Sequence, residues 1–190
     1  TLLDESRHFS ASTGAEAGAV LYIPEGDATS VTVSYSGARE GSNEKISALL
    51  CKDGEALYYG QIANAASGTQ SVNVTIPAGL DLGEYQLKLF NEQVNGDKKT
   101  DYASAFSEFT IRVIIPVTDV HLDKTAITLV KGNTKKLIAT IEPDNATIQD
   151  VEWETSDPNI AKVDDNGTVT AVSAGKATIT VITKEGRKTD

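Results

Sequence analysis

The stretch GNTKKLIATIEPDNATIQDVEWETSDPNIAKVDDNGTVTAVSAGKATITVITKEG, residues 132–186, decides the fold of the C-terminal part of the chain. Its short runs alternate apolar with polar residues, so Val151 and Trp153 face the same side of one strand. Asp165-Asn166-Gly167 supplies a tight hairpin turn, because Asn and Gly tolerate a positive φ. These features predict a small antiparallel β-sandwich in which Trp153 is buried.

Further motifs stand in a fixed order on both sides of this tryptophan. They are Val120-His121-Leu122, Ile127-Thr128-Leu129, Gly132, the run from Leu137 to Pro143, Val151-Glu152-Trp153, Ser156-Asp157, Ala161-Lys162-Val163 and Val172-Ser173-Ala174-Gly175. Together they resemble a bacterial immunoglobulin-like domain of group 2, which we place at residues 116–190. The resemblance implies paired strands in the first two motifs and a setting outside the bacterial cell. It also implies that the last strand of the domain is truncated, because family members continue beyond the turn at residues 184–190.

Residues 1–115 predict a second β-sandwich. Alternating runs recur in SVTVSYSG (30–37), TQSVNVTIPAG (69–79), GEYQLKLFNE (83–92) and SEFTIRVI (107–114), with turn signals between them. We expect about seven short strands, the count typical of an immunoglobulin-type sandwich. Three stretches resemble the Ig-like modules that accompany group 2 domains in Gram-positive surface proteins: VLYIPEGDATSVTVSYSGAREGSNEKISALL (20–50), ALYYG (56–60) and IPAGLDLGEYQLKLFNEQVNGDKKTDYAS (76–104). The expected fold class is therefore all-β, with two tandem immunoglobulin-like antiparallel β-sandwiches.

One motif sharpens the prediction for the first half. Asp81-Leu82-Gly83-Glu84-Tyr85 resembles the tyrosine corner of immunoglobulin-type sandwiches, in which the tyrosine hydroxyl bonds to nearby backbone. Leu87 stands where an antibody domain has its second disulfide cysteine. Because Cys51 is the single cysteine, apolar packing must replace that bridge. Cys51 itself lies in a strand-like run, where we expect a buried apolar residue and not a nucleophile.

The two halves meet at a short hinge, Ile114-Ile115-Pro116-Val117-Thr118. Proline removes a backbone donor and stiffens the chain, which is typical of a link between strands of two domains. A linker this short predicts a semi-rigid rod. The chain begins at Thr1 without a methionine, which we interpret as a piece of a longer precursor. Neighbouring domains of that chain are therefore its first expected partners.

The charge balance argues against two classes of partner. The chain has 17 Lys and Arg against 27 Asp and Glu, a net charge of -10. An acidic surface repels the phosphates of nucleic acids and anionic lipids. No run approaches the roughly 20 apolar residues that a membrane span needs. We therefore expect neither nucleic-acid binding nor membrane insertion.

Catalytic and metal-binding patterns are missing from the sequence. The two histidines, His8 and His121, stand in different halves, and no HExxH, GxSxG or CxxC motif is present. We therefore expect that the chain is not an enzyme and that it binds no cofactor. The Asp and Asn residues at turns are expected to bond to backbone and not to hold calcium. They are Asp97, Asp101, Asp157, Asp164, Asp165 and Asn166.

Ligand binding remains as an alternative to a purely structural role. Tyr58 and Tyr59 are neighbours in a strand, so one of them faces away from the core. Tyr102 lies in the polar stretch 91–104, and long loops at a sandwich end often carry binding residues. The candidate binding residues, for a host protein or a glycan, are Tyr59, Asn95, Asp97, Lys98 and Tyr102.

These observations lead to two hypotheses of function. The first is a non-enzymatic extracellular spacer or stalk of a bacterial cell-surface or cell-wall protein, with adhesion as an additional role. The alternative is a carbohydrate-binding accessory module of a secreted glycoside hydrolase.

Overall fold

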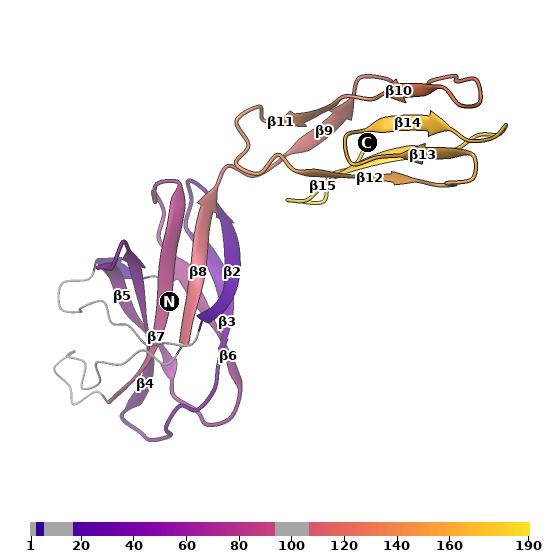
Figure 1. Cartoon of the computed structure of the whole chain (residues 1–190). Helices are drawn as coiled ribbons and strands as arrows, with labels where there is room; N and C mark the ends of the chain where they lie inside the picture. Colours follow the sequence, from indigo (N-terminus) through magenta and orange to yellow (C-terminus); the bar gives the residue numbers. More distant parts are fainter. Residues whose placement is uncertain (1–2, 6–16, 94–106) are drawn as a thin grey trace. The chain divides into compact units, whose positions relative to one another are not determined.

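The computed structural model describes residues 3–5, 17–93 and 107–190 (Figure 1). Every regular element within these ranges is a β-strand, which confirms the all-β prediction. Within the same ranges, no helix is long and apolar enough to span a bilayer. The chain divides into two compact units, Thr1–Ile114 and Ile115–Asp190.

The N-terminal unit contains eight strands within its described residues. They are β1 (Asp4–Glu5), β2 (Ala17–Pro24), β3 (Thr29–Tyr35), β4 (Glu44–Lys52), β5 (Glu55–Asn64), β6 (Gln70–Ile76), β7 (Gly83–Gln93) and β8 (Ser107–Ile114). Six form one sheet in the order β1-β5-β4-β7-β8-β2, and β3 pairs with β6 in a second sheet. The count differs from the expected seven by the two-residue strand β1.

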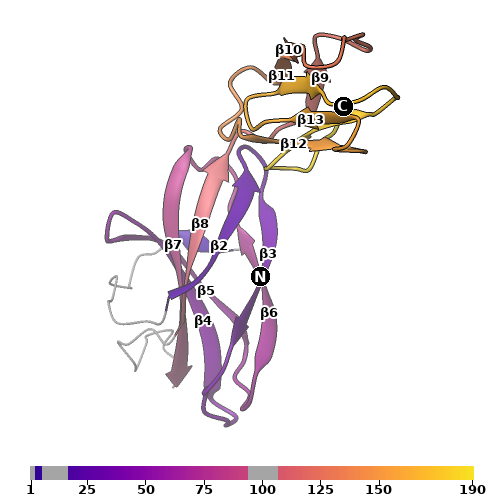
Figure 2. The same cartoon turned by 45° about the vertical axis from the view of Figure 1, so that its right-hand side comes forward.

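The main core of this unit lies between the two sheets, which Figure 2 shows as separate layers. Side chains that alternate between the two faces of each strand form this core. On β3, Val31 and Val33 are buried, while Thr32 between them is exposed. The larger sheet contributes the fully buried Leu50 and Leu87. Burying each such side chain contributes roughly 1.5–3 kcal/mol.

One strand pair departs from the expected antiparallel arrangement. Strand β2 runs parallel to β8, with Leu21 opposite Ile111. Parallel neighbours need a long crossover between them. Strands β3 to β7 lie between β2 and β8 in the sequence, so this requirement is met. Residues 17–24 form a continuous run of small and apolar residues, which carries no information about the direction of the strand.

The hairpin of β4 and β5 is closed by Asp53 and Gly54. Both residues have positive φ, 52° and 83°. A two-residue loop with this backbone matches the right-handed twist of the strands that it joins. The turn predicted from the Asp-Gly pair is therefore confirmed.

The predicted tyrosine corner is also confirmed. The Tyr85 hydroxyl donates to the carbonyl oxygen of Asp81 at 2.9 Å. Leu87 is fully buried, as expected of the residue that replaces a disulfide cysteine. Cys51 is fully buried as well, and its thiol is free, as predicted.

The C-terminal unit contains seven described strands in small sheets. They are β9 (Asp119–Leu122), β10 (Thr134–Lys136), β11 (Ala139–Glu142), β12 (Val151–Thr155), β13 (Ala161–Val163), β14 (Thr168–Ala171) and β15 (Ile179–Thr183). The sheets are β10-β14-β13, β11-β9 and β12-β15, all with antiparallel pairs.

Trp153 on β12 alternates with exposed glutamates, as predicted, but its side chain is only half-buried. It packs against Gly167 in the turn between β13 and β14. A Cβ at Gly167 would lie 2.6 Å from Cζ2 of the indole. Gly167 has a φ of 78°, whereas Asn166 is not among the residues with positive φ. The predicted turn is present, and glycine alone supplies its left-handed residue.

The predicted strand at Ile127–Leu129 is wrong. Residues 127–129 belong to no strand, because the partner of β9 is β11. Ile127 and Leu129 are nevertheless half-buried and Thr128 is exposed, so the alternation that prompted the prediction persists without ladder bonds.

Residues 188–190 pair with β15. Val181 and Asp190 exchange backbone hydrogen bonds of 2.9 and 3.2 Å. The carboxylate of Asp190 also accepts from the backbone N–H of Leu122 at 2.5 Å. These bonds link the chain after β15 to both β15 and β9.

Candidate ligand-binding site

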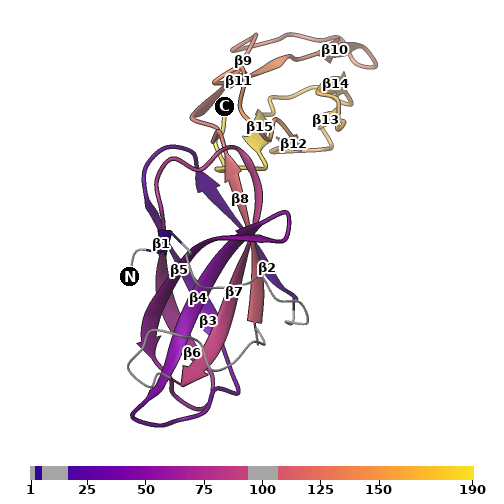
Figure 3. The same cartoon turned by 90° about the vertical axis from the view of Figure 1, so that its left-hand side faces the viewer.

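The outer face of the six-stranded sheet, opposite the main core, carries a second cluster of buried side chains. Leu49 and Cys51 on β4 and Phe90 on β7 are fully buried in it. Figure 3 shows β4 and β7 side by side, in agreement with their ladder. Strand β4 is thus buried on both faces, which explains why KISALLCK is nearly continuous in apolar and small residues.

A buried carboxylate lies on the same face. Glu92 on β7 has no exposed surface, and its Oε2 accepts two hydrogen bonds. Ser47 Oγ donates at 2.5 Å and Tyr59 Oη donates at 2.7 Å. A buried charge is costly unless hydrogen bonds compensate it, so these hydroxyl groups hold Glu92 in place.

Tyr59 links this carboxylate to strand β5. Burial raises the pKa of Tyr59 to about 12, and the bond to Glu92 acts in the same direction. Hydrogen bonds with Ser47 and Gln61 act in the opposite direction. Tyr58 packs on the main core and Tyr59 on the outer cluster, so the predicted opposite orientation of the two rings is confirmed.

A β-bulge beside Tyr59 brings polar side chains to this face. In the β4–β5 ladder, Ala63 lies opposite Ile46 and Gln61 lies opposite Ser47, so Ile62 is the extra residue. Residues three apart in a regular strand point to opposite faces. Because of the bulge, Gln61 and Asn64 both lie on the outer face.

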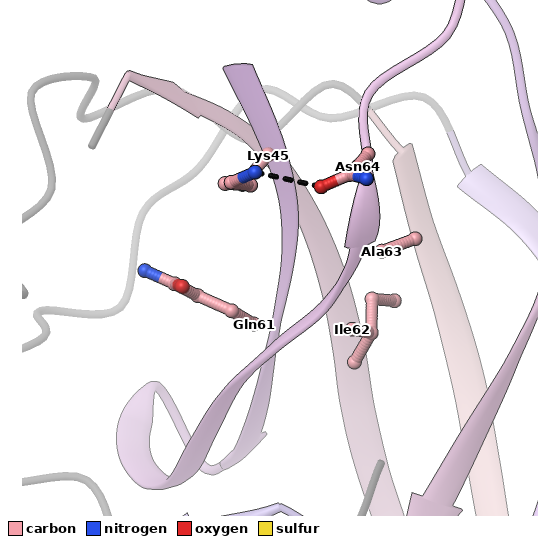
Figure 4. A pocket seen from close by; sticks show the side chains of 5 residues that line it. All are labelled: Lys45, Gln61, Ile62, Ala63 and Asn64. Carbon is pink, nitrogen blue, oxygen red and sulfur yellow. Dashed lines mark hydrogen bonds between the residues drawn. The ribbon is translucent and has the colours of Figure 1, made fainter. Parts of the chain in front are cut away.

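These residues border a hollow of about 370 Å³, lined by Lys45, Gln61, Ile62, Ala63 and Asn64 (Figure 4). Lys45 Nζ donates to Asn64 Oδ1 at 2.6 Å. In the β4–β7 ladder, Glu92 lies directly opposite Lys45. The hollow therefore offers amide donors and acceptors beside an ammonium group and a buried carboxylate.

The sequence-predicted residues are only partly placed. Tyr59 belongs to the outer-face cluster, half-buried and not displayed as an open platform. Asn95, Asp97, Lys98 and Tyr102 lie outside the described residues, as do His8 and Asp101, and stay predictions. Sequence reasoning missed Lys45, Gln61 and Asn64. The signal available was the break in alternation at Gln61-Ile62-Ala63-Asn64, which marks a bulge.

Two of the predicted turn residues, Asp157 and Asp164, bond to backbone as expected. Asp164 Oδ1 accepts from the N–H groups of Asn166 and Thr168 at 3.0 and 2.8 Å. These bonds, with that of Thr168 as the main cause, lower the pKa of Asp164. Asp157 accepts from Asn159 in the same way.

Cys51 and His121 belong to residue types that can be reactive. Burial raises the pKa of the Cys51 thiol. His121 lies 3.5 Å from Asp119 and 3.7 Å from Glu142, with more than half of its side chain exposed. Among residues 3–5, 17–93 and 107–190, no group of three His, Cys, Asp or Glu side chains is arranged to hold a metal ion.

Residues 116–190 match the family model of the bacterial Ig-like domain (group 2), which confirms the resemblance stated for these residues. Several curated relatives match part of the chain. One is an uncharacterized protein of Clostridium acetobutylicum, 44% identical over 69 residues, or 36% of this chain and 17% of that protein. A second is an alpha-L-arabinofuranosidase of Bifidobacterium longum, 38% identical over 80 residues, or 42% of this chain and 8% of that protein. A third is a lacto-N-biosidase of Bifidobacterium bifidum, 44% identical over 62 residues, or 33% of this chain and 6% of that protein.

The chain thus spans less than a fifth of the length of each of these relatives. Among solved structures, the extracellular portion of mouse CD200RLa is similar at 10% identity and a TM-score of 0.32, covering 93% of this chain and 96% of that one.

Proposed function

Because residues 116–190 form a bacterial Ig-like domain of group 2, we propose that the chain is a non-catalytic accessory region of an extracellular bacterial protein. In this proposal the C-terminal unit is a spacer that holds other parts of the protein away from the cell wall. Adhesion is a further role of the parent protein that the same arrangement would serve.

The match to the group 2 model carries this proposal, and the relatives support it. The arabinofuranosidase and the lacto-N-biosidase are named for different activities, and the matched stretch is 8% and 6% of their lengths. A short segment shared by enzymes of different activity is a poor place for either chemistry. It suits a part that supplies distance and solubility. The net charge of -10 favours solubility in the same way.

The described side chains favour a non-catalytic role. The thiol of Cys51 is buried, so it lacks the exposed thiolate that a nucleophile needs. The imidazole of His121 lies beside the carboxylates of its own strand pair, Asp119 and Glu142.

The test is antibody labelling of the N-terminal unit on intact cells of the producing bacterium. Deleting residues 116–190 should reduce labelling, because the unit then lies closer to the wall. Replacing the same residues with an unrelated Ig-like domain of equal length should restore it. A replacement as poorly labelled as the deletion would show that the domain makes specific contacts, and a deletion without effect would contradict the spacer role.

A second candidate function is carbohydrate binding in a secreted enzyme that acts on glycans. The names of two relatives favour it, since an arabinofuranosidase and a lacto-N-biosidase both act on saccharides. Under this function the N-terminal unit binds the glycan and the group 2 domain links it to the rest of the protein. A glycan array probed with the whole chain tests it, and specific retention of one glycan class is the expected result.

A further inference from the structure

We propose that the hollow beside the β4–β5 bulge binds a neutral saccharide, an inference that rests on the second candidate function. The site consists of Gln61, Asn64 and Lys45, the three polar side chains that line the hollow. The buried Glu92 and Ser47 and the half-buried Tyr59 form a hydrogen-bonded group beside it on the same face.

The bulge itself points to a site. Bulges are common next to functional sites, because the extra residue re-aims the side chains around it. Here the extra residue is Ile62, and its effect is to place Gln61 and Asn64 on one face. In Figure 4, Lys45 and Asn64 meet through a hydrogen bond and Gln61 extends from the next part of the strand.

The lining chemistry matches a ligand rich in hydroxyl groups. Each primary amide carries two N–H donors and a carbonyl acceptor. Gln61 and Asn64 can therefore bond to a hydroxyl group that donates and to one that accepts. A sugar ring carries such hydroxyl groups on neighbouring carbons, so a pair of amides separated by the hollow can hold it in one orientation.

The charges around the hollow favour a neutral ligand. Lys45 is half-buried at the edge of the site, and Glu92 lies opposite it in the ladder. The charges of Lys45 and Glu92, which face one another on neighbouring strands, largely cancel, so little net charge is left to attract an anion. The ammonium group of Lys45 also donates to Asn64 and, at 3.4 Å, to the carbonyl oxygen of Ser42.

The hydrogen-bonded group of Glu92, Ser47 and Tyr59 reduces the entropic cost of binding a ligand in the hollow. Gln61 shares a side-chain hydrogen bond with Tyr59, whose hydroxyl is held by Glu92. A side chain that is ordered before the ligand arrives loses less conformational entropy on binding. The hollow has a volume of about 370 Å³ and is shallow and open to solvent, so a ligand there would be only partly enclosed. It suits one end or one unit of an oligosaccharide.

Isothermal titration calorimetry of the whole 190-residue chain tests this site. The neutral probes are an arabino-oligosaccharide and lacto-N-biose, and an oligogalacturonide is the anionic comparison. We expect one neutral probe to bind. Gln61→Ala and Asn64→Ala should each weaken its binding at least about tenfold, the scale of one lost hydrogen bond to a ligand.

Ser71→Ala is the matched control, because Ser71 is exposed on β6 in the other sheet. It should leave the affinity unchanged. Protection of the Cys51 thiol from labelling in each variant confirms that the N-terminal unit is folded. No binding by either neutral probe, tighter binding of the anionic probe, or binding insensitive to both amide substitutions would overturn the proposal. None of these results bears on the spacer role, which the labelling of intact cells tests separately.

Discussion

The hydroxyl of Tyr85 donates a hydrogen bond of 2.9 Å to the carbonyl oxygen of Asp81, four residues earlier. The ring is almost fully buried, and Lys52 Nζ lies 4.9 Å from its centroid. This bond closes the turn that leads into β7, the strand that pairs with both β4 and β8. The corner therefore fixes how a central strand of the larger sheet begins.

Tyr85→Phe removes this bond and keeps the ring. We expect the free energy of unfolding of the N-terminal unit to fall by about 1 kcal/mol, since the carbonyl of Asp81 loses its partner. Urea denaturation followed by circular dichroism measures the change. Tyr22→Phe is the control, because Tyr22 is 49% exposed and its substitution should change stability by no more than about 0.5 kcal/mol. Equal effects of the two substitutions would contradict the role of the corner.

Gly167→Ala tests the contact between the turn and Trp153. The new Cβ would lie 2.6 Å from the indole and 2.9 Å from the Leu137 carbonyl oxygen, at a φ of 78°. We expect a loss of more than about 2 kcal/mol, from a clash added to the cost of a left-handed alanine. Trp153 is the single tryptophan, so its fluorescence reports the unfolding of the C-terminal unit alone.

Gly132→Ala is the matched control for this substitution. Gly132 has a similar φ of 87°, but nothing lies within 4 Å of an added Cβ. Gly132→Ala should lower the free energy of unfolding only by the cost of placing an alanine at a left-handed φ, about 1–2 kcal/mol. The difference between the two variants isolates the clash with Trp153. Equal losses would show that the indole moves aside without cost.

Cys51 should resist thiol reagents in the folded chain. It is fully buried, and burial raises its pKa, so both access and thiolate content are low. We expect labelling by a disulfide reagent to be slow without denaturant and fast in urea. Phe90→Ala should accelerate labelling, because it opens the outer-face cluster. Rapid labelling of the native protein would contradict the buried outer face.

Tyr59 gives the N-terminal unit a dependence on alkaline pH. Its folded pKa is about 12, above the value of about 10 for an unfolded tyrosine. The stabilisation is fully present below about pH 10 and is lost as the pH rises through 12, because the unfolded chain releases its proton first. In an ultraviolet titration, Tyr59→Phe should remove a tyrosine that ionises near pH 12. Loss of a residue that titrates near pH 10 would contradict the assignment.

Period-two alternation in the sequence predicts most of the fold. The runs at 30–37, 69–79, 83–92 and 107–114 correspond to β3, β6, β7 and β8. Their success has a physical cause, since one face of each strand is buried in the main core. The same rule misled at Ile127–Leu129, where alternating burial occurs without a paired strand. It could not give the parallel direction of β2, which depends on a partner far along the chain.

The candidate site was much less predictable. Tyr59 was identified from its neighbour Tyr58, because adjacent residues must face opposite sides. Gln61 and Asn64 were missed, because regular alternation assigns them to different faces and only the bulge at Ile62 unites them. Hydroxyl groups on two other strands, those of Ser47 and Tyr59, stabilise Glu92 in its buried position. No local sequence pattern predicts hydrogen bonds between residues so far apart in the chain.

The most direct test of the account is a nuclear magnetic resonance titration of the isotope-labelled chain with the neutral oligosaccharides. We predict shift changes confined to the region of β4, β5 and Glu92, none in residues 115–190, and no cleavage of the sugar. Shift changes centred on residues 115–190 would contradict the spacer role of the group 2 domain. Release of cleaved sugar would contradict the non-catalytic role of the whole chain.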